Sequence, residues 1–226
     1  PTRMTLDNYR ELFVRAGMGR FLFNSFLIST CVMLLSLLFN TLAGYAFAKL
    51  NFKGRDRTFR ALLAALVIPA QVAMMPLFLL LKQMGLVNTY MGAIVPGMAA
   101  IFGIFLVRQY ARSIPDELLE AARIDGATPL QLFRLVYLPL MVPSLVAVGT
   151  YALLLAWNEY LYGFLLLSNE QHLTLAVALG NFLAADDSPW ELLMATGFVY
   201  ALPPAAIYYA FKRYMVSGLT AGAVKS

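Results

Sequence analysis

The stretch ELLEAARIDGATPLQLFRLVYLP, residues 117–139, lies between two long apolar runs, and the interpretation of the whole chain depends on it. Just before it, Ser113 and Asp116 have the spacing of a capping box and Pro115 suits a first helical turn, so a helix is predicted to begin there. Gly126 suits the left-handed residue that ends a helix. The sequence therefore predicts a short helix followed by a turn.

A second helix is predicted directly after this turn. Thr128, Pro129 and Gln131 supply an N-cap, a first-turn proline and a capping partner. At 100° per residue the first helix has a polar and an apolar face. The polar face carries Asp116, Glu120 and Arg123. The apolar face carries Leu118, Leu119 and Ala122.

The composition places this segment in a membrane protein. Hydrophobic residues make up 61% of the chain and charged residues 13%, against about 25% charged residues in soluble domains. Five apolar runs are long enough to cross a bilayer, which takes about 20 residues. These runs are 21–48, 59–81, 90–107, 140–167 and 192–211. The predicted fold is all-α, a polytopic transmembrane helical bundle that forms one domain over residues 1–226.

Basic residues set the predicted orientation, because Lys and Arg accumulate in short cytoplasmic loops. They follow the first, third and fifth runs, at Lys49, Lys53, Arg55, Arg57, Arg60, Arg108, Arg112, Arg123, Arg134, Lys212, Arg213 and Lys225. The loop at 168–191 carries four acidic residues and no Lys or Arg. Residues 112–139 and the C-terminus are therefore predicted to be cytoplasmic, and the first helix of 112–139 to lie flat with its polar face toward the cytosol. The net charge of +5 follows from this topology and gives no reason to expect nucleic acid.

The first twenty residues do not fit this rule, since they carry four arginines against Asp7 and Glu11 on the predicted outer side. The odd number of runs and the missing initiating Met favour an additional span before Pro1, which would give six in the complete protein. A five-span protein with an outer N-terminus is the alternative.

Cysteine and histidine exclude several kinds of chemistry. Cys31 and His172 are each the single residue of their type, so the sequence predicts no metal site, no Cys/His pair and no intramolecular disulfide. A nucleotide-binding G-x-x-x-x-G-K-[ST] loop is also missing from the sequence. No catalytic residue and no cofactor in this chain are predicted.

The segment resembles the EAA loop of ATP-binding cassette (ABC) importer permeases, whose pattern is E-A-A-x3-G-x9-I-x-L-P. The matching residues are Glu120, Ala121, Ala122, Gly126, Leu138 and Pro139, with Val136 in place of Ile. TLDNY at 5–9, GLVNTY at 85–90, WNEY at 157–160 and GLTAGAVK at 218–225 are similar to the maltose-type carbohydrate permeases.

The resemblance implies a permease subunit that imports a carbohydrate by alternating access across a bacterial or archaeal inner membrane. It implies that the short helix of the cytoplasmic coupling loop 112–139 docks on a separate ATPase, through residues that include Glu120, Ala121, Ala122, Asp125, Gly126 and Pro139. The implied partners are a second permease, expected to be a different chain, a dimer of ATPase subunits that holds ATP and Mg, and an extracytoplasmic substrate-binding protein. Contact of the tail 218–226 with the ATPase dimer is also implied.

Four polar residues in or near the spans are candidates for the translocation path, because unpaired polar groups are costly in lipid. They are Asn40, Gln71, Asn158 and Glu159. A subunit-interface or structural role is the alternative for the last two. Ala185, Asp186, Asp187 and Ser188 are predicted to form the loop tip that contacts the binding protein, with an ordinary acidic loop as the alternative.

Two other functions remain open. A permease for a polyol or a glycerol phosphate would fit the same motif. An ion-coupled secondary transporter is less favoured, because neither a second inverted repeat nor a midplane carboxylate is found in the sequence.

Overall fold

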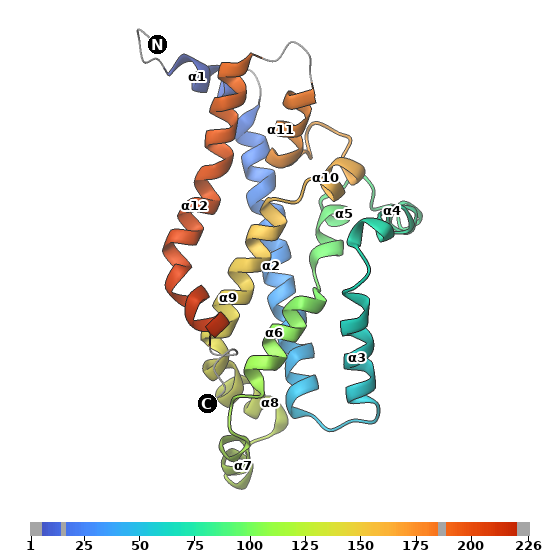
Figure 1. The fold of residues 1–226 in the computed structure, drawn as a ribbon, viewed down its shortest axis with the longest axis vertical. Coiled ribbons are helices and arrows are strands. Elements are labelled where there is room, and N and C mark those ends of the chain that lie inside the picture. Colours follow the sequence, from blue (N-terminus) through green and yellow to red (C-terminus); the bar gives the residue numbers. More distant parts are fainter. Residues whose placement is uncertain (1–5, 15–16, 185–188, 221–226) are drawn as a thin grey trace. The chain divides into compact units, whose positions relative to one another are not determined.

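The computed structural model describes residues 6–14, 17–184 and 189–220, with side chains as far as Lys212, and every regular element in this part of the chain is a helix. Figure 1 shows the elements. They are α1 (Asp7–Val14), α2 (Met18–Lys49), α3 (Arg55–Ala65), η1 (Ala70–Ala73), α4 (Met74–Gln83), α5 (Tyr90–Ile94), η2 (Val95–Gly97), α6 (Ile101–Ala111), α7 (Asp116–Ile124), α8 (Pro129–Gln131), η3 (Leu132–Tyr137), α9 (Leu138–Trp157), α10 (Leu161–Leu166), α11 (Leu175–Ala184) and α12 (Trp190–Thr220). The predicted all-α fold is confirmed.

The five predicted spans are only partly continuous. In the described residues, α2, the helix over Pro129–Trp157 and α12 are long and apolar enough to cross a membrane, and there are up to five spans if each of two broken pairs counts as one. The predicted runs 59–81 and 90–107 correspond to these broken pairs. Pro69 lies in the first break and Pro96 in η2, just before the second, and proline removes an N–H and disfavours helix in the residue before it.

Two further boundaries differ from the prediction. The run 140–167 is not one helix, because α9 ends at Trp157 and α10 begins only at Leu161. The carboxylate of Glu159 accepts a hydrogen bond from the N–H of Tyr162 at 2.9 Å, which satisfies a free donor in the first turn of α10. The outer loop 168–191 contains the apolar helix α11.

The chain divides into two compact units, which are described here separately. The first comprises Pro1–Val32, Ala70–Gly97 and Leu153–Tyr209, and the second comprises Met33–Pro69, Met98–Ala152 and Ala210–Ser226. The core of the first unit contains Leu12, Met18, Trp157, Leu175, Ala195 and Val199. The core of the second unit contains Tyr45, Val107, Ala111, Ile114, Tyr137, Met141 and Val148.

Close packing in the second unit fixes the base of the segment that follows α6. A Cβ on Gly44 would overlap the side chain of Val107, so α2 and α6 can approach this closely only with glycine there. The ring of Tyr45 lies 4.6 Å from the ring of Tyr137 and 5.0 Å from that of Phe133, measured between centroids. These aromatic contacts attach η3 to α2.

Candidate functional sites

The segment 112–139 forms the predicted pair of helices, but its first helix begins differently from the prediction. Pro115 occupies the N-cap position of α7, which has no side-chain cap, and the Ser113 hydroxyl instead donates to the carbonyl of Tyr110 at 2.7 Å. The predicted capping box of Ser113 and Asp116 is therefore wrong. Asp116 has another partner, because its carboxylate accepts a hydrogen bond from Lys49.

Lys49 ties the start of α7 to the end of α2. Its side chain is only 5% exposed, and its Nζ lies 2.6 Å from Asp116 Oδ1 and 2.6 Å from the carbonyl oxygen of Ile114. A buried ammonium group must be paired, since an unpaired one is strongly destabilising. The hydrogen bond and the positive charge of Lys49 hold the pKa of Asp116 below its usual value.

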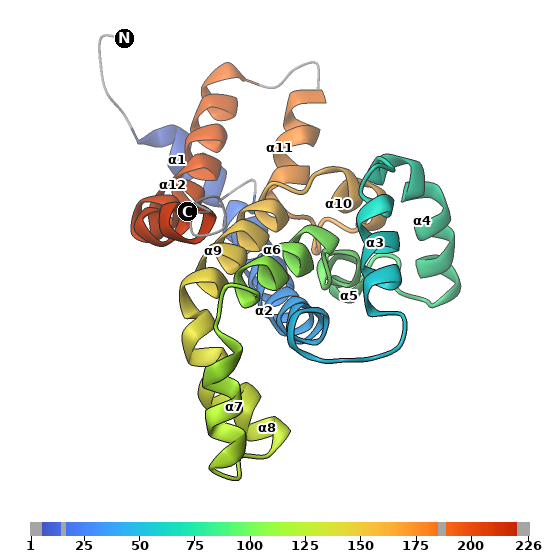
Figure 2. The same ribbon diagram turned by 60° about the horizontal axis from the view of Figure 1, so that its bottom comes forward.

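The turn and the second helix start agree with the prediction. Gly126 has a φ of 84°, in the left-handed region, and the N–H of Ala127 bonds to the carbonyl of Ala122 at 2.9 Å. Thr128 and Gln131 form a capping box, in which the N–H of Thr128 donates to Gln131 Oε1 at 2.8 Å. The chain then continues through η3 into α9. Figures 1 and 2 show α7 and α8 side by side beyond the end of α6.

The segment exposes large apolar side chains, which we call the coupling surface. It consists of Leu118, Ile124, Leu130 and Leu135, which are 46%, 86%, 73% and 66% exposed. Leu119 and Leu132 point the other way and are buried. Leu118 was predicted on the same face as Leu119, and the structure separates the two.

The motif residues lie around the coupling surface. Glu120, Ala121, Asp125, Gly126 and Pro139 are exposed, and Ala122 is half-buried. Their side chains are therefore accessible to a partner, and most of the contacts that shape the turn come from the backbone.

Asn40 lies in the second unit and is completely buried. Its Oδ1 accepts a hydrogen bond from the N–H of Ala100 at 3.1 Å, and its Nδ2 donates to Ser36 Oγ at 2.7 Å. A Cβ on Gly103 would overlap its carboxamide. Asn40 thus satisfies a backbone donor just before α6, where the helical hydrogen bonds are interrupted.

The other three path candidates belong to the first unit. Gln71 is exposed in η1. Asn158 Oδ1 accepts a hydrogen bond from the Tyr200 hydroxyl at 2.6 Å, and Glu159 caps α10 as described above. Asn158, Tyr160, Gly180 and Tyr200 are among the residues that line a hollow of about 500 Å³ beside α11. Asn158 and Glu159 therefore have structural partners, while Asn158 also faces an open space.

A buried polar network that the sequence reasoning missed holds the outer loop in the first unit. Asn24 is completely buried, its Nδ2 donates to the carbonyls of Gln171 and Leu173 at 2.9 and 2.8 Å, and its Oδ1 accepts from the Tyr90 hydroxyl at 2.9 Å. The hydroxyl of Ser25 accepts from the N–H of Leu175 at 2.8 Å. The available signal in the sequence was an Asn within an apolar run, the same signal as at Asn40.

The GLVNTY motif supports the same loop. Asn88 has a φ of 62°, and its Oδ1 accepts hydrogen bonds from the N–H groups of Ser168 and Asn169 at 3.2 and 2.9 Å. The next residue, Thr89, caps α5 by accepting from the N–H of Gly92. The base of the outer loop is thus held from both α2 and the loop before α5. The predicted tip, Ala185 to Ser188, lies outside the described residues.

Residues 40–220 match the family described as "Binding-protein-dependent transport system inner membrane component", and the chain belongs to this family. The arabinooligosaccharides transport system permease protein of Halalkalibacterium halodurans is 39% identical over 226 residues, which cover 100% of this chain and 81% of that protein. The arabinooligosaccharides transport system permease protein of Bacillus subtilis is 33% identical over 226 residues, which cover 100% of this chain and 80% of that protein. The predicted resemblance to ABC importer permeases is confirmed.

Two solved structures share the fold. A chain of a bacterial ABC transporter involved in the import of the acidic polysaccharide alginate has a TM-score of 0.82 at 25% identity, covering 91% of this chain and 78% of that chain. A chain of the MetNI methionine ABC transporter has a TM-score of 0.66 at 19% identity, covering 88% and 94%. The second likeness concerns the fold alone.

Proposed function

We propose that the chain is the permease subunit through which an ATP-driven importer moves an oligosaccharide or a related sugar into the cytoplasm. Several relatives support the substrate class: two are arabinooligosaccharide permeases, and a relative in Rhizobium meliloti, 34% identical, is an alpha-glucoside permease. The hollow of about 500 Å³ lined by Asn158, Tyr160 and Tyr200 has the volume of a small-molecule site.

The coupling surface carries this proposal. Exposed apolar side chains on an otherwise polar segment are typical of a surface that is covered by a protein partner. The segment is held in place by Lys49 on one side and by the aromatic contacts of η3 on the other. A partner that pushes on it can therefore move the second unit as a body.

The partners follow from this arrangement. A separate ATPase dimer, with ATP and Mg bound to it, covers the coupling surface on the cytoplasmic side, where the C-terminus also lies. A second permease completes the membrane part, and a substrate-binding protein contacts the loop whose base is held by Asn24 and Asn88. The coupling segment and the base of the outer loop are preorganised, which lowers the entropic cost of docking.

The test is ATP-dependent uptake by vesicles that contain the permease, its ATPase, its partner permease and the binding protein. Uptake of an arabino- or gluco-oligosaccharide that requires ATP and the binding protein would support the proposal. Uptake of a polyol or a glycerol phosphate without any sugar uptake would replace the substrate class. Uptake that follows an ion gradient and ignores ATP would reject the coupling mechanism.

A further inference from the structure

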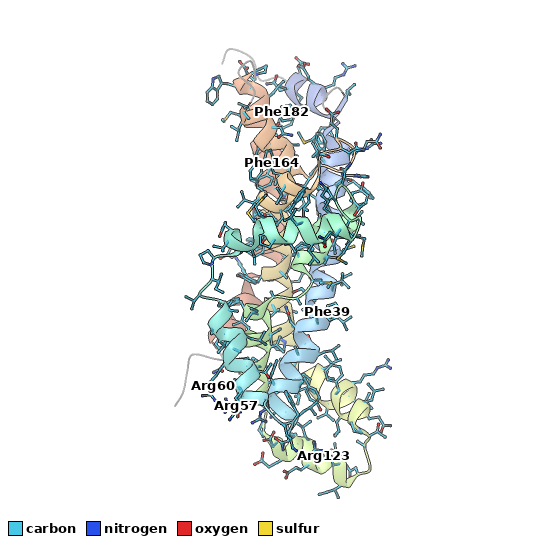
Figure 3. All side chains as sticks on the ribbon, turned by 90° about the vertical axis from the view of Figure 1, so that its right-hand side faces the viewer. Phe39, Arg57, Arg60, Arg123, Phe164 and Phe182 are labelled. Atoms are coloured by element: carbon cyan, nitrogen blue, oxygen red, sulfur yellow. The ribbon has the colours of Figure 1, made fainter. Side chains whose placement is uncertain are left out.

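A strongly basic surface lies at the ends of α2, α3 and α6 in the second unit, apart from the coupling surface. One hollow of about 520 Å³ is lined by Lys49, Arg55, Arg108 and Arg112 together with Asp56 and Asp116. A second of about 620 Å³ shares Arg55 and Asp56 and adds Lys53, Arg57 and Arg60. We call the two together the basic hollow. Figure 3 shows Arg57 and Arg60 in the N-terminal half of α3.

The carboxylates present do not balance these charges. Seven basic side chains line the basic hollow against two carboxylates. Asp116 is engaged by Lys49, while Asp56 Oδ1 lies 3.4 Å from Arg55 Nε and 3.8 Å from Arg108 Nη2. An excess of positive charge gathered around a concave surface favours an anion there.

Part of this surface is rigidly built. Arg108 is 12% exposed, its guanidinium carbon lies 3.9 Å from the centroid of the Phe59 ring, and its Nε donates to the carbonyl of Phe47 at 3.2 Å. Lys49 is held equally firmly by Ile114 and Asp116. A general excess of Lys and Arg on the cytoplasmic side explains the composition of the loop, but it does not require buried, hydrogen-bonded cations around a hollow.

An apolar stripe continues from the basic hollow along α3. Arg57, Arg60, Ala61 and Ala64 are exposed and share one face, since they are three or four residues apart. The exposed Leu66, Val67 and Ile68 follow them. Leu50 and Phe52, also exposed, border the basic end. The surface therefore places the cations of the first turns of α3 beside an apolar track that starts at Ala61 and continues past the end of the helix at Ala65.

We propose that the basic hollow binds the phosphate headgroup of an anionic phospholipid, whose acyl chains lie along the exposed face of α3. The lipid comes from the leaflet on the side of the coupling surface, where basic pockets at span ends meet anionic headgroups. A soluble phosphate would use the cations and leave the apolar stripe uncovered. A docked protein loop would not need the stripe to continue toward the interior of the membrane. The inference rests on the membrane orientation given under the proposed function.

The test is native mass spectrometry of the purified transporter complex, titrated with phosphatidylglycerol or with phosphatidylcholine. The variant Arg57→Gln/Arg60→Gln removes two exposed charges, and Arg10→Gln/Arg20→Gln is the matched control at exposed positions in the first unit. Since each charge contributes about 5-fold, phosphatidylglycerol is expected to bind about 30-fold more weakly to the first variant and unchanged to the control. Lys53→Gln should give about a 5-fold loss on its own.

Four results would overturn the proposal. Equal binding of phosphatidylcholine would show only an unspecific lipid shell, and equal affinity in wild type and variant would place the lipid elsewhere. If inorganic phosphate displaced phosphatidylglycerol and occupied the site to the same extent, the site would be assigned to a soluble anion. Loss of the ATPase from the complex with unchanged lipid binding would make the surface a protein interface. Lipid binding is measured without any transport assay. A failure of the uptake experiment would therefore not change the interpretation of the lipid measurement.

Discussion

The coupling segment at 116–139 and the base of the outer loop at 166–175 are held by different kinds of hydrogen bonds. The coupling segment is shaped mainly by local hydrogen bonds, such as the Thr128 capping box, and leaves Ile124 and Leu130 exposed. The base of the outer loop is held by bonds between residues far apart in sequence, such as Asn24 to Leu173. One region therefore leaves large apolar side chains exposed, and the other satisfies its polar groups within the chain.

This difference has an energetic consequence. Breaking a local cap changes the shape of one turn, whereas removing a buried side chain that serves several partners leaves all of them unsatisfied at once. Substitutions in the outer loop network should therefore reduce stability. Substitutions on the coupling surface should reduce assembly and leave stability nearly unchanged. The following predictions compare the two regions in that way.

The largest effect is expected for Asn24→Ala. It leaves two carbonyls and the Tyr90 hydroxyl without their partner, which should cost about 2–4 kcal/mol and lower the thermal midpoint in detergent by about 5–15 °C. Ser29→Ala is the control, because the Ser29 hydroxyl donates only to carbonyls within its own helix, and should cost less than about 1 kcal/mol. Equal losses in both variants would show that the network does not hold the loop.

A smaller effect on folding is expected for Gly126→Val. A Cβ at this position meets nothing within 4 Å, but the φ of 84° disfavours a β-branched residue by about 1–2 kcal/mol. The turn should shift, so copurification of the ATPase should fall while the permease still inserts. Gly126→Asn tolerates this φ and should retain assembly. If Gly126→Asn reduces copurification of the ATPase as much as Gly126→Val does, the partner requires the absence of a side chain at this position. The backbone conformation would then not be the cause.

Asp116→Asn tests the link between α2 and α7. Because Lys49 lowers the pKa of Asp116, the ion pair stabilises the folded state above the ordinary pKa of a carboxyl and loses this contribution as the pH falls through the lowered value. Asp116 is largely exposed, so we expect a loss of about 1 kcal/mol or less at pH 7. The difference in thermal midpoint between wild type and variant should shrink as the pH approaches 3. A difference that grows on acidification would contradict this assignment.

The smallest effect is expected for Tyr137→Phe. The Tyr137 hydroxyl is buried and has no hydrogen-bond partner among the described residues, while the ring packs against Tyr45. Removing the hydroxyl should leave stability unchanged or raise it by up to about 1 kcal/mol. Thermal unfolding in detergent measures this. A clear loss of stability would mean that the hydroxyl has a partner after all, such as a water molecule.

The same contrast explains what the sequence could predict. Gly126, Thr128 and Gln131 act on neighbours within five residues, so their roles follow from spacing and were predicted correctly. The capping box predicted at the start of α7 was wrong because Asp116 is bound by Lys49, 67 residues away, and no local pattern indicates that pairing.

The broken helices show a further limit. Proline can break a span, but Pro143, Pro203 and Pro204 lie inside continuous helices while Pro69 lies in a break, and hydropathy does not sense whether the helical hydrogen bonds continue. Asn40 was correctly identified as a buried polar residue within a span. The structure adds that it accepts a hydrogen bond from the N–H of Ala100. Asn24 carried the same signal and was overlooked.

The central claim is that the coupling surface is covered by an ATPase subunit, and Ile124→Ser/Leu130→Ser tests it most directly. Both side chains are more than 70% exposed, so the variant should fold and keep the wild-type thermal midpoint. The matched control is Leu6→Ser/Val14→Ser, which changes two similarly exposed apolar residues outside both proposed surfaces. The measurement is copurification of the ATPase with each variant, followed by binding-protein-stimulated ATP hydrolysis in vesicles. We predict loss of both for Ile124→Ser/Leu130→Ser alone, and wild-type assembly and stimulation in this variant would contradict the account.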